Sequence, residues 1–75
     1  MLADKEIDLS GLRCPLPVLR TKKALSQLAA GQILCVLTTD SDSRQDIPAF
    51  VKQAGHIVLD IVSEDTKNYF YIHKQ

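Results

Sequence analysis

The sequence predicts a two-layer α/β sandwich with the element order β-α-β-α-β-β. Two observations carry this prediction: apolar residues recur with the period of a strand in four short segments, and with the period of a helix in two segments between them. Because strand–helix–strand connections are right-handed, both helices should cover the same face of the sheet. We expect residues 1–75 to form one domain of this kind.

Glycines help to delimit the first elements. Alternation over residues 6–10 predicts a strand that ends at Gly11, and an amphipathic pattern over residues 15–29 predicts a helix that ends before Gly31. The apolar run 33–37 has the length of a strand and lacks polar alternation. It should therefore be buried inside the sheet.

The second half of the chain predicts one helix and a hairpin. Apolar residues at helical spacing run from Ile47 to Ala54, but Pro48 is tolerated only in the first turn of a regular helix. Either the helix starts near Asp46 or its opening turn is distorted. Residues 57–62 and 69–72 then alternate as two strands of a hairpin.

Composition and charge exclude several classes of function. Hydrophobic residues make up 45% of the chain, as in a globular domain, and nine basic side chains balance nine acidic ones. We therefore expect neither direct nucleic acid binding nor membrane association. The beginning of the sequence lacks the apolar core of a signal peptide, which predicts a cytoplasmic protein. The two cysteines form no metal-binding or disulfide pattern, so we expect no metal site.

Cys14 is the candidate catalytic residue. It lies between the first strand and the first helix, where open α/β sheets place ligand-handling groups. Pro15 fits the first helical position, which would make Cys14 the N-cap. The positive end of the helix dipole and the neighbouring Arg13 should then lower the thiol pKa. The alternative interpretation is that Cys14 is only a small apolar residue that packs at a rigid helix start. Cys35 lies inside a predicted strand and should be buried and unreactive.

The residues after Cys14 should support the thiolate. Pro15 and Pro17 stiffen the loop and remove two amide donors from the first turn, which leaves the amides of Leu16 and Val18 to face the sulfur.

A docking surface should lie beside the thiol. Leu16 points away from the apolar side of the helix, next to Arg20 and Lys23, and could form the centre of a docking patch, although these lysine and arginine side chains could simply be solvated. The loop from Asp40 to Asp46 follows the second strand and should reach the same edge of the sheet, where Arg44 and Asp46 are further docking candidates. Arg44 could steady an anionic sulfur, contact a partner or remain solvated.

The histidines do not suit a cysteine hydrolase. His56 should begin the third strand and His73 should end the fourth, which places both at the edge opposite Cys14. A Cys–His dyad requires hydrogen-bond reach.

Two motifs resemble those of a known family. Residues 7–17, Ile-Asp-Leu-Ser-Gly-Leu-Arg-Cys-Pro-Leu-Pro, closely resemble the signature of the TusA-like sulfur-carrier family, in which Gly-Leu-x-Cys-Pro-x-Pro opens the first helix. Residues 44–50 are similar to the family's Arg-Asp-Ile-Pro helix start, with Gln45 added between Arg and Asp. The resemblance extends from about Glu6 to Lys74.

The resemblance implies a sulfurtransferase that works with partners. Family members have a mixed four-stranded sheet with an antiparallel fourth strand, and their motif cysteine accepts sulfane sulfur from a cysteine desulfurase as a persulfide. They pass it to an acceptor protein, in one branch toward 2-thiolation of tRNA wobble uridine, without a metal or organic cofactor. By this resemblance Cys14 is the persulfide carrier. Leu16 replaces the glutamate of the tRNA-thiolation members, and the segment is more similar to members associated with sulfur oxidation or sulfur trafficking.

A second class of function is a non-catalytic regulatory or RNA-binding module with an incidental thiol. The neutral charge balance and the lack of an interleaved aromatic and basic stripe count against RNA binding.

Overall fold

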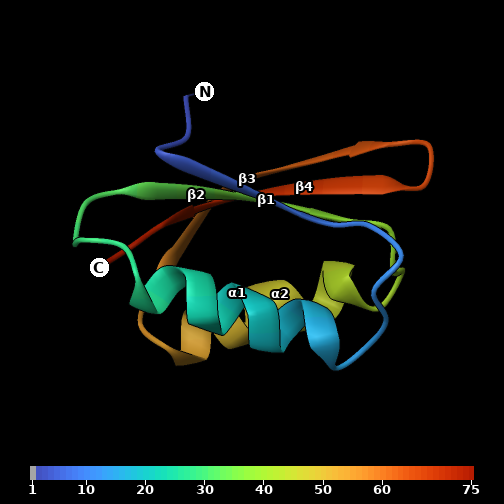
Figure 1. Ribbon diagram of the computed structural model, residues 1–75, viewed down its shortest axis with the longest axis horizontal. Helices are drawn as coiled ribbons and strands as arrows, with labels where there is room; N and C mark the ends of the chain where they lie inside the picture. The colour runs from blue at the N-terminus through green and yellow to red at the C-terminus, as the bar shows by residue number, and fades with distance from the viewer. Residues whose placement is uncertain (1) are drawn as a thin grey trace.

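The computed structural model describes residues 2–75. In chain order its elements are β1 (Lys5–Leu9), α1 (Leu16–Ser26), β2 (Ile33–Thr38), α2 (Ser43–Gln53), β3 (Ile57–Glu64) and β4 (Lys67–His73). The predicted order β-α-β-α-β-β is confirmed. Both helices lie on one side of the sheet, which gives the predicted two layers (Figure 1).

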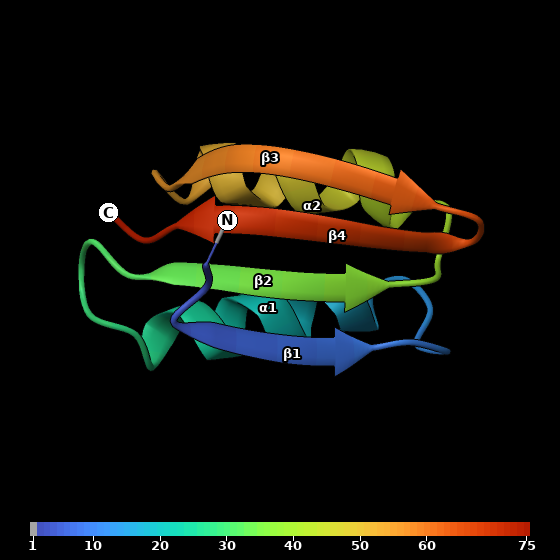
Figure 2. The same cartoon turned by 90° about the horizontal axis from the view of Figure 1, so that it is seen from above.

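The sheet is mixed. Its strand order is β1-β2-β4-β3, with β1 and β2 parallel and β4 antiparallel to both of its neighbours (Figure 2). The antiparallel fourth strand implied by the family resemblance is thus confirmed. β2 is an inner strand whose side chains are all buried or half-buried, as its apolar sequence without alternation predicted.

The core lies between the sheet and the two helices. It is formed by aliphatic and aromatic side chains from both layers: Leu9, Ala24, Leu25, Leu34, Val36, Ile47, Val51, Phe70 and Ile72. Burial of these side chains is the main force that holds the helices against the sheet.

α1 is shorter than predicted. It ends at Ser26 rather than at Ala29, because the Leu28 amide donates to the Leu25 carbonyl in an i→i−3 bond that tightens and ends the helix. Leu28 is still half-buried against the core, so the apolar spacing continues beyond the helix. Gly31, at φ +91°, lies in the turn that follows.

The structure shows where the helix that contains Pro48 begins. The helix begins at Ser43, so a start near Asp46 is wrong, and Pro48 lies inside the helix. In the opening turn the Asp42 carbonyl accepts both the Gln45 amide, in an i→i−3 bond of 3.1 Å, and the Asp46 amide, in a regular i→i−4 bond of 2.9 Å. Pro48 has no N–H, so one α-helical hydrogen bond is missing.

The β3–β4 hairpin contains a bulge that the sequence period did not predict. The register shifts between Val58 and Asp60, which leaves Leu59 without a partner. A two-residue loop joins the strands, and its Asp65 has φ 52°, a conformation that aspartate tolerates. Among residues 2–75 no helix is long and apolar enough to span a membrane.

Two leucines of α1 test the location of the core. Leu25→Ala should lower the free energy of unfolding by about 2–5 kcal/mol, because Leu25 is only 2% exposed and its truncation leaves a cavity. Leu19→Ala, at a position that is 54% exposed, should change it by about 0.5 kcal/mol or less. Urea unfolding followed by circular dichroism measures both, and equal losses would contradict the assigned packing of α1.

Candidate functional site

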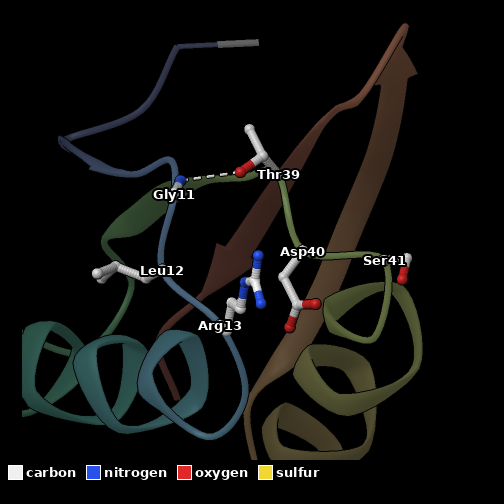
Figure 3. A pocket seen from close by; sticks show the side chains of 6 residues that line it. All are labelled: Gly11, Leu12, Arg13, Thr39, Asp40 and Ser41. Atoms are coloured by element: carbon white, nitrogen blue, oxygen red, sulfur yellow. Dashed lines mark hydrogen bonds between the residues drawn. The ribbon is translucent and has the colours of Figure 1, made fainter.

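Two loops meet at the edge where β1 and β2 end. Because these strands are parallel, their carboxyl ends lie side by side, and the loops that follow them come into contact. The Gly11 amide donates to Thr39 Oγ1 over 2.8 Å (Figure 3), and the Cys14 amide donates to Asp40 Oδ2 over 3.1 Å. Cys14 is therefore held at this edge by its own backbone.

A cavity of about 370 Å³ lies between the two loops (Figure 3). Its walls come from three residues of each loop: Gly11, Leu12, Arg13, Thr39, Asp40 and Ser41. Arg13, the neighbour of Cys14 in sequence, forms part of this cavity wall.

Cys14 is exposed, as predicted, but it is not the N-cap of α1. The N-cap is Pro15 and the first helical residue is Leu16, while the Cys14–Pro15 peptide bond is cis. The Leu16 amide donates to the Arg13 carbonyl over 2.9 Å and closes a turn around Cys14 and Pro15. This amide is therefore not available to the sulfur, contrary to prediction.

Nearby carboxylates raise the pKa of the Cys14 thiol. The Asp46 side chain, hydrogen-bonded to the sulfur, raises the pKa of Cys14, and partial desolvation and the negative charges of Asp46, Asp42 and Asp40 act in the same direction. The predicted lowering of the pKa is wrong, because negative charge close to the sulfur disfavours the thiolate. In the free protein Cys14 is held as a thiol.

The loop of these carboxylates lies at the predicted edge, but no effect of Asp40, Asp42 or Asp46 on the thiol pKa was predicted. The available signal was the Asp-Ser-Asp run just after β2, at the end of a strand parallel to the one that precedes Cys14.

The remaining helix-start residues support the fold rather than the sulfur. Pro17 is buried, and its carbonyl accepts the Thr21 hydroxyl over 2.7 Å. Val18 is half-buried and packs against the core. Neither side chain contributes to the exposed surface around Cys14.

The outer face of α1 carries an exposed patch of mixed character. Leu16 is 41% exposed, as predicted, and Arg20 and Lys23 are exposed one and two turns further along. Leu19, which was not among the predicted docking residues, belongs to the same surface because it follows Leu16 at i+3. We call Leu16, Leu19, Arg20 and Lys23 the docking patch.

Arg44 lies toward the hairpin rather than toward the thiol. It is exposed and lines a cavity of about 170 Å³ whose walls include Asp65, Thr66 and Asn68. The carboxylates around Cys14, not Arg44, set the charge at the sulfur.

The histidines lie at the opposite edge, as predicted. His73 pairs with Ile33 and Ile57 at the far ends of β2 and β3, and His56 Nδ1 accepts the Gln75 amide over 3.0 Å. No Cys–His dyad can form with Cys14. Within residues 2–75, no three side chains of His, Cys, Asp or Glu are grouped to hold a metal ion.

Comparisons with known proteins agree with this fold and motif. The family model described as sulfurtransferase TusA matches residues 5–74. The sulfur carrier protein TusA of Allochromatium vinosum is 46% identical over 71 residues, covering 95% of this chain and 93% of that protein. The putative sulfur carrier protein YrkI of Bacillus subtilis is 43% identical over 74 residues, 99% of each chain.

A solved structure shares the architecture. The crystal structure of a SirA-like protein from Desulfitobacterium hafniense superposes with a TM-score of 0.82 at 32% sequence identity, covering 92% of this chain and 95% of that one.

The carboxylates around Cys14 predict a shifted pH profile. Alkylation by iodoacetamide requires the thiolate, so in a Cys35→Ser background its rate should reach half-maximum at higher pH than for a free cysteine. Asp46→Asn removes the largest cause of the raised Cys14 pKa and should move the midpoint of the rate profile to lower pH. Asp65→Asn, in the hairpin loop, is the control for loss of one charge. An unchanged midpoint in Asp46→Asn would contradict the role of Asp46.

Proposed function

The chain belongs to the TusA family of sulfur carriers, and on this basis we propose that Cys14 carries the transferred sulfur as a persulfide. The single observation that supports this assignment is the exposure of the two thiols. Cys14 is exposed at the edge of the sheet, whereas Cys35 is only 5% exposed inside it. A partner protein can reach the first sulfur without unfolding the carrier.

Loading is a thiol–persulfide exchange. The donor, a cysteine desulfurase, presents a cysteine persulfide, and the Cys14 sulfur attacks its terminal sulfane sulfur. The sulfur–sulfur bond of the donor breaks, the donor cysteine leaves as a thiolate that takes up a proton, and Cys14 becomes a persulfide. Transfer to the acceptor protein repeats this exchange with the acceptor thiol as the attacking group. No net oxidation occurs in either step.

Asp46 is the group that we propose to accept the Cys14 proton during loading. Its carboxylate has the largest effect on the pKa of the Cys14 thiol, which supports a direct transfer of the proton to it. The high pKa of Cys14 also protects the free carrier, because a thiol is oxidised more slowly than a thiolate. Attack then begins when a donor positions its sulfane sulfur against Cys14.

The docking patch is the surface that we propose for donor and acceptor. Its leucines supply an apolar centre and its basic side chains a charged rim, as in many protein interfaces. Leu16 is adjacent to the Cys14–Pro15 unit, so a protein bound to the patch also covers the thiol. Leucine in place of glutamate at this position favours acceptors of sulfur oxidation or trafficking over those of tRNA thiolation.

Sulfur loading tests the role of Cys14. Incubation with a cysteine desulfurase and ³⁵S-cysteine should add one sulfur atom per chain, visible by intact mass and removed by reductant. Cys14→Ser should abolish this addition. Cys35→Ser is the matched control and should retain it, because the thiol that it removes is buried. A reductant-sensitive label that persists in the Cys14→Ser protein would overturn the assignment.

Leu16→Glu tests the docking patch. The melting temperature should stay close to that of the unchanged protein, because Leu16 lies outside the core, while the rate of sulfur loading or the choice of acceptor should change. Leu59→Glu is the matched control, since Leu59 is 42% exposed on β3 and lies outside the patch. A large loss of thermal stability in Leu16→Glu, or an equal change in transfer in both variants, would contradict the proposed patch.

A further inference from the structure

The second face of the sheet carries an organised set of side chains. The helices cover one face only (Figures 1 and 2). On the other face, cross-strand pairing aligns side chains in rows. One row crosses the four strands as Glu6, Cys35, Tyr71 and Asp60. The next row, two residues along, is Asp8, Leu37, Tyr69 and Val62. We call these two rows the acidic–aromatic face.

A cavity of about 350 Å³ lies on this face over β1, β2 and β4. Its apolar surface comes from Ile7, Cys35 and Leu37, and the half-buried Tyr69 and Tyr71 add two aromatic rings. Acidic side chains complete the lining. Cys35 and Tyr71 are cross-strand partners within it. The cavity therefore combines an apolar and aromatic surface with negative charge.

Both edges of the acidic–aromatic face are negatively charged. Glu6 and Asp8 are exposed on β1, and Asp60 is exposed on β3. The pKa of Tyr71, in the middle of the face, is raised by Cys35 and by desolvation, and to a smaller extent by the carboxylates of Glu6 and Asp60. Hydrogen bonds from Ser10 lower the pKa of Asp8, and the positive charge of Lys67, at the hairpin end, also lowers it.

The positive charges that could balance these carboxylates lie mostly elsewhere. The three arginines of the chain are in the loop before α1, on α1 and on α2. Although the whole chain has no net charge, the acidic–aromatic face carries local negative charge.

We propose that the acidic–aromatic face binds an arginine-containing segment of a partner protein. A guanidinium group stacks on tyrosine rings and pairs with carboxylates, and its aliphatic stem covers apolar side chains. Tyr69 and Tyr71 provide the rings, Glu6 and Asp8 the carboxylates, and Leu37 the apolar contact. An RNA backbone is repelled by the same carboxylates, and a second copy of the face would oppose like charges.

This binding is independent of sulfur transfer. Cys14 and the docking patch belong to the loop before α1 and to α1 itself, whereas the acidic–aromatic face is the side of the sheet that the helices leave uncovered. A partner could therefore remain attached to the sheet while a second protein exchanges sulfur with Cys14. The Cys14→Ser protein should bind the segment as well as the unchanged protein does.

Nuclear magnetic resonance titration of the full ¹⁵N-labelled chain tests the proposal. The probe is the peptide acetyl-Gly-Arg-Leu-Arg-Gly-amide, with acetyl-Gly-Glu-Leu-Glu-Gly-amide as the control peptide. The arginine peptide should shift the backbone amides of residues 6–8, 35–37 and 69–71, and the glutamate peptide should not. Glu6→Lys should weaken binding at least about fivefold, because it turns an attraction into a repulsion.

Glu64→Lys is the matched variant. It changes the net charge by the same amount at an exposed position at the end of β3, outside the cavity, and should weaken binding less than Glu6→Lys does. Equal weakening in both variants would overturn the proposal in favour of general electrostatic attraction. Amide shifts confined to residues 40–46 would overturn it as well, as would tighter binding of a twelve-nucleotide oligouridylate or dimerisation through this face.

Discussion

The parallel pairing of β1 with β2 is the constraint on which the site depends. It brings the carboxyl ends of both strands to one edge, so the loop that carries Cys14 lies against the loop that carries Asp40. Two hydrogen bonds join these loops, from the Gly11 amide to Thr39 and from the Cys14 amide to Asp40. Residues 26 positions apart in the chain therefore share one site. The antiparallel β4 completes the sheet without disturbing this edge.

The electrostatics of the thiol suit a carrier better than an independent catalyst. An enzyme that attacks its own substrate benefits from a thiolate at neutral pH, whereas Cys14 is exposed and its pKa is raised by Asp46, Asp42 and Asp40. In our proposal reactivity appears only in the complex, where a partner excludes water and supplies the sulfane sulfur. The free thiol then avoids side reactions before a donor binds.

The neutral net charge conceals two different surfaces. The docking patch on α1 combines exposed leucines with Arg20 and Lys23, while the uncovered face of the sheet combines tyrosines with Glu6 and Asp8. Each surface is defined by the secondary structure beneath it, because a helix groups residues three and four apart and a sheet groups residues from neighbouring strands. The net charge of the whole sequence cannot distinguish these two surfaces.

The sequence by itself determined the element order, the single helix-covered face, the exposed position of Leu16 and the burial of Cys35, because local spacing decides which side of an element a residue occupies. The motif around Cys14 likewise determined the family. Only the tertiary structure decided the direction of the Cys14 pKa, the opening of α2 and the bulge at Leu59. The physical reason is that these features depend on groups brought together across loops and strands. The charge around a thiol is set by distance in space, and Asp46 is near Cys14 only after β1 and β2 have paired.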